Sequence, residues 1–260
     1  MDGFIVCFVT VRKAIHPDQR TSGFTLVELS VLLVIIGLVV AGIMTGHHML
    51  EQTKLKHISK GYEEVNLSLL AFKVKYNALP GDMSNATDIW GTHGAGGATA
   101  NGDGNGQIPL SCAGELRRVF EHMTLAELYG GTYDADSASN PTAARVGPGY
   151  AFPSSRVNPA MGMSVGVPTA WSSQALWRHL SHKHIIFTML PNGNCLEDGY
   201  EFTSRESWEF DVKFDDGQPS TGKIGAFGGH MGCVVWASPP AYIPANITKS
   251  CDLLYILQGL

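Results

Sequence analysis

Charged residues are scarce in this 260-residue sequence: only 16% are Asp, Glu, Lys or Arg, against roughly 25% in an average soluble domain. The formal net charge is -5 at pH 7, so the chain lacks the basic excess that attracts nucleic acids and anionic lipids. It also lacks a P-loop and an H-E-x-x-H motif, which mark many phosphate-binding and zinc enzymes. Nucleic acid is therefore an unexpected partner, and we expect the protein not to be an enzyme.

Three histidines lie close together in the sequence, at His179, His182 and His184. On a strand His182 and His184 share one face, and on a helix His179 and His182 share one, so all three converge only across a helix-to-strand junction. Neither a cysteine nor an acidic residue lies at a recognised zinc-ligand spacing from them. The pattern therefore favours exposed histidines over the metal site that a membrane-tethered enzyme would need.

A long hydrophobic run extends from Phe24 to Leu50, and Glu28 is its single formal charge. The run is long enough to cross the hydrocarbon core of a bilayer as a helix, which takes about 20 residues. A secretory signal has a shorter apolar core of about 7–15 residues and an A-x-A-like cleavage site, which Ala41-Gly42-Ile43 matches poorly. The sequence therefore predicts a membrane-spanning helix, in which Glu28 is costly unless it is paired or reaches the interface.

The residues from Gly23 to Leu29 read G-F-T-L-V-E-L and resemble the processing site of type IV prepilins and type II secretion pseudopilins. The resemblance implies that prepilin peptidase cuts after Gly23 and that the new terminal residue, Phe24, is methylated. It also implies that Glu28 contacts the amino terminus of a neighbouring subunit, because a carboxylate in lipid is stabilised most by a cationic amine. The alternative is an ordinary single-pass anchor whose Glu28 reaches the headgroups.

Beyond the membrane segment, apolar residues recur every three or four positions and predict one buried stripe on a continuing helix. Pro80-Gly81 predicts the end of this helix, which we expect to run from Phe24 to about Asn77. The stripe comprises Leu55, Ile58, Tyr62, Val65, Leu69, Phe72 and Tyr76.

The resemblance divides the chain into four parts. Residues 1–23 are the leader peptide, 24–50 the transmembrane and assembly helix, 51–79 its amphipathic continuation, and 80–260 an exported globular α+β domain. Removal of the leader would take Cys7 with it and leave four cysteines on one side of the membrane.

These four cysteines form an even set in a loop-rich domain, which indicates two disulfides formed in an oxidising compartment. Three pairings are possible, and four free buried thiols are the alternative. The resemblance favours Cys233 with Cys251, because many pilins close a C-terminal loop in this way. The set comprises Cys112, Cys195, Cys233 and Cys251.

A segment rich in glycine and asparagine, from Asn101 to Ile108, resembles the first eight positions of an EF-hand-like calcium loop. Oxygen ligands at alternate positions, with glycine at the sixth, let the backbone fold around a hard cation. The twelfth position, which should be glutamate, is Cys112, and Glu115 lies three residues further on. A plain glycine-asparagine turn is the competing interpretation. The candidate calcium ligands are Asn101, Asp103, Asn105 and Gln107.

The remaining sequence mixes helical, strand and loop patterns. Residues 114–129 have the apolar spacing of a short amphipathic helix. The density of turn residues in 80–110 predicts that this segment holds neither a helix nor a central strand. Residues 130–170 are also poor in regular patterns, and we expect them to form a surface insertion. Alternating apolar and charged residues predict a strand from Trp208 to Phe214. We expect further strands at His184 to Leu190, Lys223 to Phe227 and Cys233 to Ala237.

The predicted fold class is α+β, with a long N-terminal helix packed on an antiparallel β-sheet. The first half of the helix is transmembrane, and this is the pilin-like architecture that the resemblance implies. A second stretch, DVKFDDGQPSTGKIGAF, is similar to the C-terminal part of some larger prepilin-like proteins.

The resemblance implies a structural subunit of a type IV pilus or type II secretion pseudopilus that polymerises through its N-terminal helix. The implied partners are prepilin peptidase, other pilin or pseudopilin subunits, the inner-membrane assembly platform and the lipid bilayer. The implied location is the bacterial inner membrane, with the C-terminal domain in the periplasm or outside, and then the filament. Alternatives are a minor tip pilin that binds surfaces through residues 130–170, and a single-pass membrane-anchored extracytoplasmic domain. No cofactor is required, and calcium is the candidate ligand.

Overall fold

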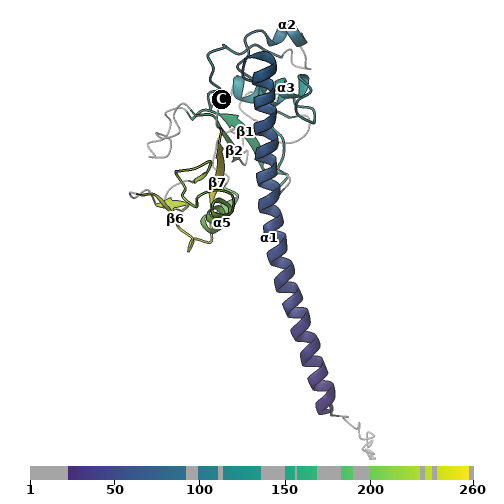
Figure 1. Cartoon of the computed structure of the whole chain (residues 1–260). Coiled ribbons are helices and arrows are strands. Elements are labelled where there is room, and N and C mark those ends of the chain that lie inside the picture. Colours follow the sequence, from purple (N-terminus) through teal and green to yellow (C-terminus); the bar gives the residue numbers. More distant parts are fainter. Residues whose placement is uncertain are drawn as a thin grey trace, which may run out of the picture. The chain divides into compact units, whose positions relative to one another are not determined.

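The computed structural model describes the chain from residue 23 to residue 257 with several gaps. The described residues are 23–91, 99–110, 114–135, 150–155, 157–168, 183–189, 200–228, 232–235 and 239–257. They fall into two compact units, Met1–Leu50 and Glu51–Leu260. The long helix α1 (Leu26–Tyr76) contributes residues to both (Figure 1).

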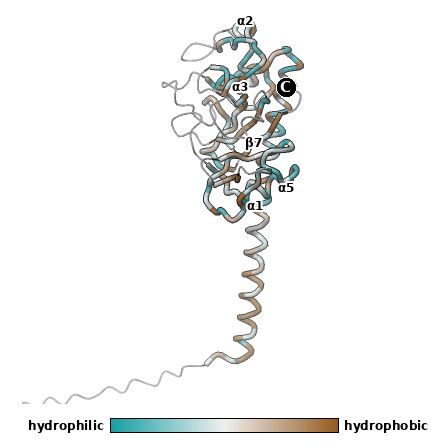
Figure 2. Tube along the Cα trace, turned by 90° about the vertical axis from the view of Figure 1, so that its left-hand side faces the viewer, coloured by the Kyte–Doolittle hydropathy of each residue, from teal (hydrophilic) through white to brown (hydrophobic). Residues whose placement is uncertain are grey.

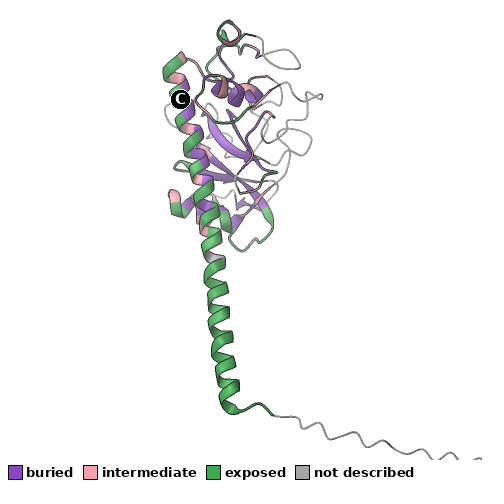
Figure 3. Cartoon of the chain, turned by 90° about the vertical axis from the view of Figure 1, so that its right-hand side faces the viewer, coloured by how far each residue is buried: buried purple, intermediate pink, exposed green. Residues whose placement is uncertain are grey.

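In the first unit, α1 is apolar on all sides and exposed on all sides. Every side chain described between residues 23 and 50 is exposed, and this stretch is mostly brown in Figure 2 and green in Figure 3. The helix is long and apolar enough to cross a membrane. A helix that is hydrophobic all round belongs in lipid or in the core of a larger assembly.

In the second unit, α1 buries the stripe that its sequence predicts. The exposed fractions of Tyr62, Val65, Leu69 and Phe72 are all zero. The Tyr62 hydroxyl donates to the Leu253 carbonyl at 3.1 Å, which ties the helix to the central strand of the sheet. The helix ends at Tyr76, and the next residue, Asn77, has a left-handed backbone with φ 51°, a common way to stop a helix.

The sheet of the second unit has five antiparallel strands. Four follow the order β1 (Gly162–Gly166), β2 (Ile185–Met189), β7 (Lys249–Ile256), β3 (Phe202–Thr203), and β4 (Ile224–Phe227) also pairs with β7. A separate two-stranded ribbon joins β5 (Val234–Val235) to β6 (Ala241–Tyr242). The long N-terminal helix and the antiparallel sheet confirm the predicted α+β class.

The predicted strand from Trp208 to Phe214 is wrong, because these residues belong to helix α5 (Ser204–Phe214). Thr203 and Glu206 form a capping box in which each side chain accepts from the other residue's backbone N–H. This motif satisfies donors that the first helical turn leaves free. The buried positions Ser204, Ser207 and Asp211 follow a helical rather than an alternating spacing, so the alternation of apolar and charged residues was misleading.

Two shorter helices follow α1 in the chain. Helix α3 (Glu115–Leu125) confirms the helix expected within residues 114–129. Helix α2 (Ala86–Trp90) corrects the expectation that residues 80–110 hold no helix. It has five residues, which tertiary contacts stabilise although turn residues surround it: its Trp90 ring lies 5.3 Å from that of Tyr76 on α1.

A disulfide joins Cys233 to Cys251 on β7, with a Cα–Cα distance of 5.1 Å. This is the pairing that the resemblance to pilins favours. It fastens the β5–β6 ribbon to the main sheet across a sequence separation of 18 residues. Cys112 and Cys195 lie outside the described residues.

Candidate functional site

The segment predicted for processing and assembly stands at the beginning of α1. Thr25 immediately precedes the helix, and its hydroxyl oxygen accepts from the Glu28 backbone N–H at 3.2 Å. In return, Glu28 Oε2 accepts from the Thr25 backbone N–H at 2.9 Å and from its hydroxyl at 2.8 Å. This is a capping box, which stabilises the first helical turn by satisfying two free donors.

The capping box gives Glu28 a role inside the chain that the sequence interpretation missed. The T-x-x-E spacing of Thr25 and Glu28 is the signal that could have revealed it. Both side-chain bonds engage Oε2, and within the described part of the chain no bond to Oε1 is seen. A carboxylate held in this way at a helix N-terminus offers one oxygen to a donor from another molecule.

The predicted cleavage point is open to approach. Phe24 is 80% exposed, and a Cβ placed on Gly23 would meet no atom within 4 Å. Residues 1–22, the predicted leader, lie outside the described part of the chain.

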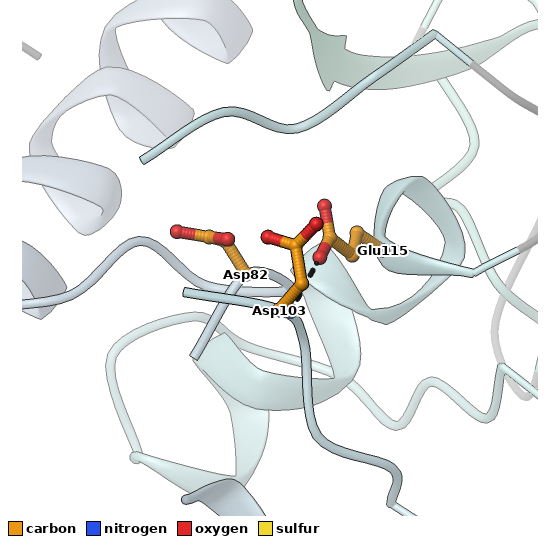
Figure 4. Close-up of side chains that lie close together, drawn as sticks. All are labelled: Asp82, Asp103 and Glu115. Atoms are coloured by element: carbon orange, nitrogen blue, oxygen red, sulfur yellow. Dashed lines mark hydrogen bonds between the residues drawn. The ribbon is translucent and has the colours of Figure 1, made fainter. Parts of the chain in front are cut away.

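A second candidate site lies in the second unit, between the loop after α1 and the start of α3. Asp82, Asp103 and Glu115 each offer one carboxylate oxygen, and these oxygens lie within 4.8 Å of one another. Figure 4 shows the Asp103 carboxylate between the other two. The Asp103 backbone N–H donates to Glu115 Oε1 at 2.8 Å.

Backbone donors hold Asp82 in place. Its two carboxylate oxygens accept from the N–H groups of Asn105 and Gly106 at 3.0 and 2.9 Å. Burial raises the pKa of Asp82 and of Glu115, and the negative charge of Asp103 raises both further. The cluster therefore places three carboxyl groups close together, two of them buried and the third, Asp103, exposed to solvent.

Two of the four predicted calcium ligands are in direct contact, because the Asp103 carboxylate accepts from the Asn105 backbone N–H at 2.9 Å and from its side-chain amide at 2.8 Å. Of the four, only Asp103 belongs to the carboxylate cluster. The Asn101 side-chain oxygen accepts from the Thr87 backbone and hydroxyl, and that of Asn105 accepts from the Gln107 N–H at 2.7 Å. The sequence did not reveal Asp82 and Glu115 as neighbours of Asp103. The three residues meet through contacts between segments distant in the chain, which have no characteristic sequence spacing. Calcium binding itself stays a prediction.

Another acidic group, Asp211, Asp215 and Asp216, follows the end of α5. Its side chains are engaged by nearby donors: Tyr242 donates to Asp211 at 2.7 Å and Thr221 donates to Asp216 at 2.6 Å. The Ile224 N–H donates to Asp215 at 2.8 Å. Burial raises the pKa of Asp211 to about 6. We interpret this group as the support of the turn between α5 and β4.

Strand β1 reads G-M-S-V-G, which matches the G-x-S-x-G pattern of a hydrolase nucleophile elbow and was missed in the sequence. An elbow needs a sharp turn from strand to helix that exposes the serine. Here the five residues pair in register with β2, and the exposed fraction of Ser164 is zero. The match therefore does not support catalysis.

Other predicted features fall partly outside the described residues. His179 and His182 are not described, and the third histidine, His184, is buried. Burial lowers the pKa of His184 to about 4, so it is neutral at pH 7. The predicted surface insertion at 130–170 is wrong in its last part, because β1 (Gly162–Gly166) is buried there and pairs with β2. Residues 136–149, 156 and 169–170 of that stretch are not described.

No protein-family model, curated protein or solved structure matches the chain.

Proposed function

We propose that the chain is a structural subunit of a type IV pilus or type II secretion pseudopilus. In this proposal, prepilin peptidase cleaves after Gly23, Phe24 becomes the methylated N-terminus, and the subunit polymerises through α1. One observation carries it: the G-F-T-L-V-E-L segment lies at the start of a helix whose described side chains up to Leu50 are all exposed.

The exposed apolar helix needs surroundings other than water. Large side chains such as Leu26, Leu38 and Met44 are 69–86% exposed, and burying a residue of this size contributes about 1.5–3 kcal/mol. Before assembly, lipid covers this surface in the proposal. In the filament, the helices of neighbouring subunits cover it, so the same residues serve as anchor and as interface.

Glu28 links the two states in this proposal. Its Oε2 caps α1, and its charge is left for the amino group of a neighbouring subunit's Phe24. An uncompensated carboxylate is expensive in an apolar interface, whereas a carboxylate paired with an amine is not. The pairing therefore favours one axial register between neighbours, and the partners are other copies of this chain or related subunits.

The proposed location follows from the anchor and the disulfide. In this proposal the helix spans the bacterial inner membrane, with the C-terminal domain in the periplasm or outside, and the inner-membrane assembly platform is a partner of the subunit. Disulfides persist in such oxidising compartments and are rare in the cytosol, and the Cys233–Cys251 bond agrees with export of this domain.

Substitutions at the capping box separate the two roles of Glu28. Glu28→Gln keeps an oxygen that can cap the helix but removes the charge, whereas Thr25→Val removes the capping hydroxyl and keeps the charge. In the native host we expect Glu28→Gln to abolish filaments in the sheared surface fraction while the subunit accumulates in the membrane. Thr25→Val should retain filaments.

The opposite pattern would overturn the proposal. If Glu28→Gln forms filaments as the unmodified chain does while Thr25→Val does not, Glu28 serves only as a helix cap. Immunoblots of the membrane fraction control for expression and insertion in both variants.

A further inference from the structure

We propose that Asp82, Asp103 and Glu115 bind one Ca²⁺ ion, which ties the loop after α1 to the first turn of α3. The inference concerns the second unit alone and is independent of whether α1 assembles into a filament. It rests on the spacing of the carboxylates, on an unsatisfied buried oxygen and on the chemistry of the donors.

The spacing suits a single ion. Calcium binds carboxylate oxygens at about 2.3–2.6 Å, so two oxygens on opposite sides of one ion lie about 5 Å apart. The three carboxylate oxygens lie within 4.8 Å of one another. All three can therefore reach one calcium ion without a large movement of the backbone.

An unsatisfied oxygen of Glu115 points independently to a ligand. Glu115 is only 8% exposed, and its Oε1 accepts from the Asp103 N–H. Its Oε2 is buried and has no hydrogen-bond donor. A buried carboxylate oxygen without a partner is unfavourable, and a cation coordinated beside Asp103 would remove the deficit.

Basic side chains do not neutralise the cluster in the described part of the chain. Arg118 acts on Glu115 through its charge, but no ion pair joins the three carboxylates to a lysine or arginine among the residues described. Three carboxylates in close contact repel one another, because like charges disfavour ionisation. A divalent cation offsets this repulsion directly.

The segments that carry the carboxylates are held at contact distance. The Gly102 N–H donates to the Met83 carbonyl at 2.8 Å, and the Gly104 N–H donates to the Asp82 carbonyl at 2.9 Å. A Cβ on Gly102 would lie 2.2 Å from the Asp82 carbonyl carbon, so only glycine permits this approach. Two ligands are thus positioned by backbone bonds before any ion arrives.

Solvent reaches the cluster at two of its members, because Asp103 is exposed and Asp82 lines a cavity. A surface cavity of about 560 Å³ is lined by Asp82 together with Lys73, Ser84 and Gly104. Calcium takes six to eight oxygen ligands in flexible geometry, whereas magnesium demands a near-ideal octahedron. Three carboxylates on separate segments, completed by water from the cavity, fit the flexible requirement of calcium.

The experiment is a calcium titration by isothermal calorimetry on the full chain in detergent micelles, after treatment with a chelator. The variants Asp103→Asn and Glu115→Gln each remove one carboxylate ligand. Asp216→Asn removes a carboxylate from the acidic group after α5 and is the matched control. Near-UV circular dichroism of the calcium-free proteins tests whether each variant is folded. If one of the two ligand variants is unfolded, the calcium affinity of the other one tests the proposal.

We expect the unmodified chain and Asp216→Asn to bind one equivalent of calcium and to melt at a higher temperature with calcium than without it. Asp103→Asn and Glu115→Gln should bind about tenfold more weakly or worse, because ligand charge sets calcium affinity. Magnesium should bind more weakly than calcium.

Four results would overturn the proposal. The first is no binding by the unmodified chain at about 1 mM calcium, the weak end for extracellular modules, in which case the carboxyl groups share protons instead. The second is undiminished binding by Asp103→Asn and Glu115→Gln. The third is loss of binding in Asp216→Asn, which would place the ion after α5. The fourth is tighter binding of magnesium.

Discussion

The two stretches of α1 share one secondary structure and have opposite relations to water. Before Leu50, every described side chain is exposed although nearly all are apolar. After Glu51, the apolar residues form a stripe, and Tyr62 to Phe72 on that stripe are buried against the domain, while apolar residues off the stripe, such as Leu67 and Val74, stay exposed. The apolar stripe of the second stretch is covered by its own chain, whereas the apolar side chains of the first stretch are not covered by the described residues.

This difference separates the part of α1 that its own domain covers from the part that its own domain leaves exposed. Apolar residues on one face of a helix need only one domain to cover them, whereas apolar residues on every face need lipid or several neighbours. The boundary lies near Glu51, where charged residues return to the sequence. A substitution in the exposed stretch of α1 should therefore leave the stability of the domain unchanged, and a substitution in the domain or in the buried stripe should leave membrane insertion unchanged.

The largest effect on stability is expected at Phe72. Its side chain is fully buried, and Phe72→Ala should lower the free energy of unfolding of the domain by about 3–5 kcal/mol. Val74→Ala is the matched control, because Val74 is 88% exposed and should change stability by less than about 0.5 kcal/mol. Urea unfolding of the full chain in micelles, followed by near-UV circular dichroism, measures both. Equal effects at the two positions would contradict the buried stripe.

A charge in the first stretch should act on the membrane and not on the domain. Ile36→Asp places a carboxylate in the middle of the apolar run and should cost about 2.5–3.5 kcal/mol of insertion free energy. We expect less protein in the membrane fraction and an unchanged urea midpoint for the domain. Ile36→Leu is the control and should behave as the unmodified chain does. A domain destabilised by Ile36→Asp would show that the two stretches are not independent.

The smallest of these effects is a pH dependence at His122, beside the end of α1. Its Nδ1 accepts from the Gly81 N–H at 2.9 Å, and burial lowers the pKa of His122 from 6.5 to about 4. The neutral imidazole therefore contributes stability that is complete above pH 6.5 and is lost as the pH falls towards about 4. His184 contributes with the same sign.

The variant His122→Asn keeps an acceptor for Gly81 and does not titrate. We expect the unmodified chain to lose more stability than this variant between pH 6.5 and 4, while the other titrating groups are common to both. Urea midpoints measured at intervals across this range give the difference. Parallel curves for the two proteins would show that His122 is not held neutral by the fold.

Periodic patterns made the long elements of the fold predictable from the sequence. The stripe from Leu55 to Phe72 defined its helix because a period of three to four over many turns has no other interpretation. The strand predicted at Trp208 failed because seven residues of alternation also fit a helix with a polar flank. Thr203 and Glu206, at capping-box spacing, carried the decisive information.

The candidate sites were predictable to different degrees. Gly23, Phe24 and Glu28 lie within one short segment, and their interpretation as a processing and assembly site rests on the resemblance of that segment and stays a prediction. The carboxylate cluster joins Asp82, Asp103 and Glu115 from three separate segments, which the close approach of Gly102 to Asp82 and the bond from the Asp103 N–H to Glu115 bring together. Sequence spacing suggested Asp103 alone, because contacts between distant segments leave no periodic signal.

The measurement that tests the central claim most directly is intact-mass and N-terminal peptide analysis of the protein extracted from the membranes of its native host. The account predicts a chain that begins at N-methylated Phe24 and has lost residues 1–23. A chain that retains these residues in cells with an active prepilin peptidase would contradict it.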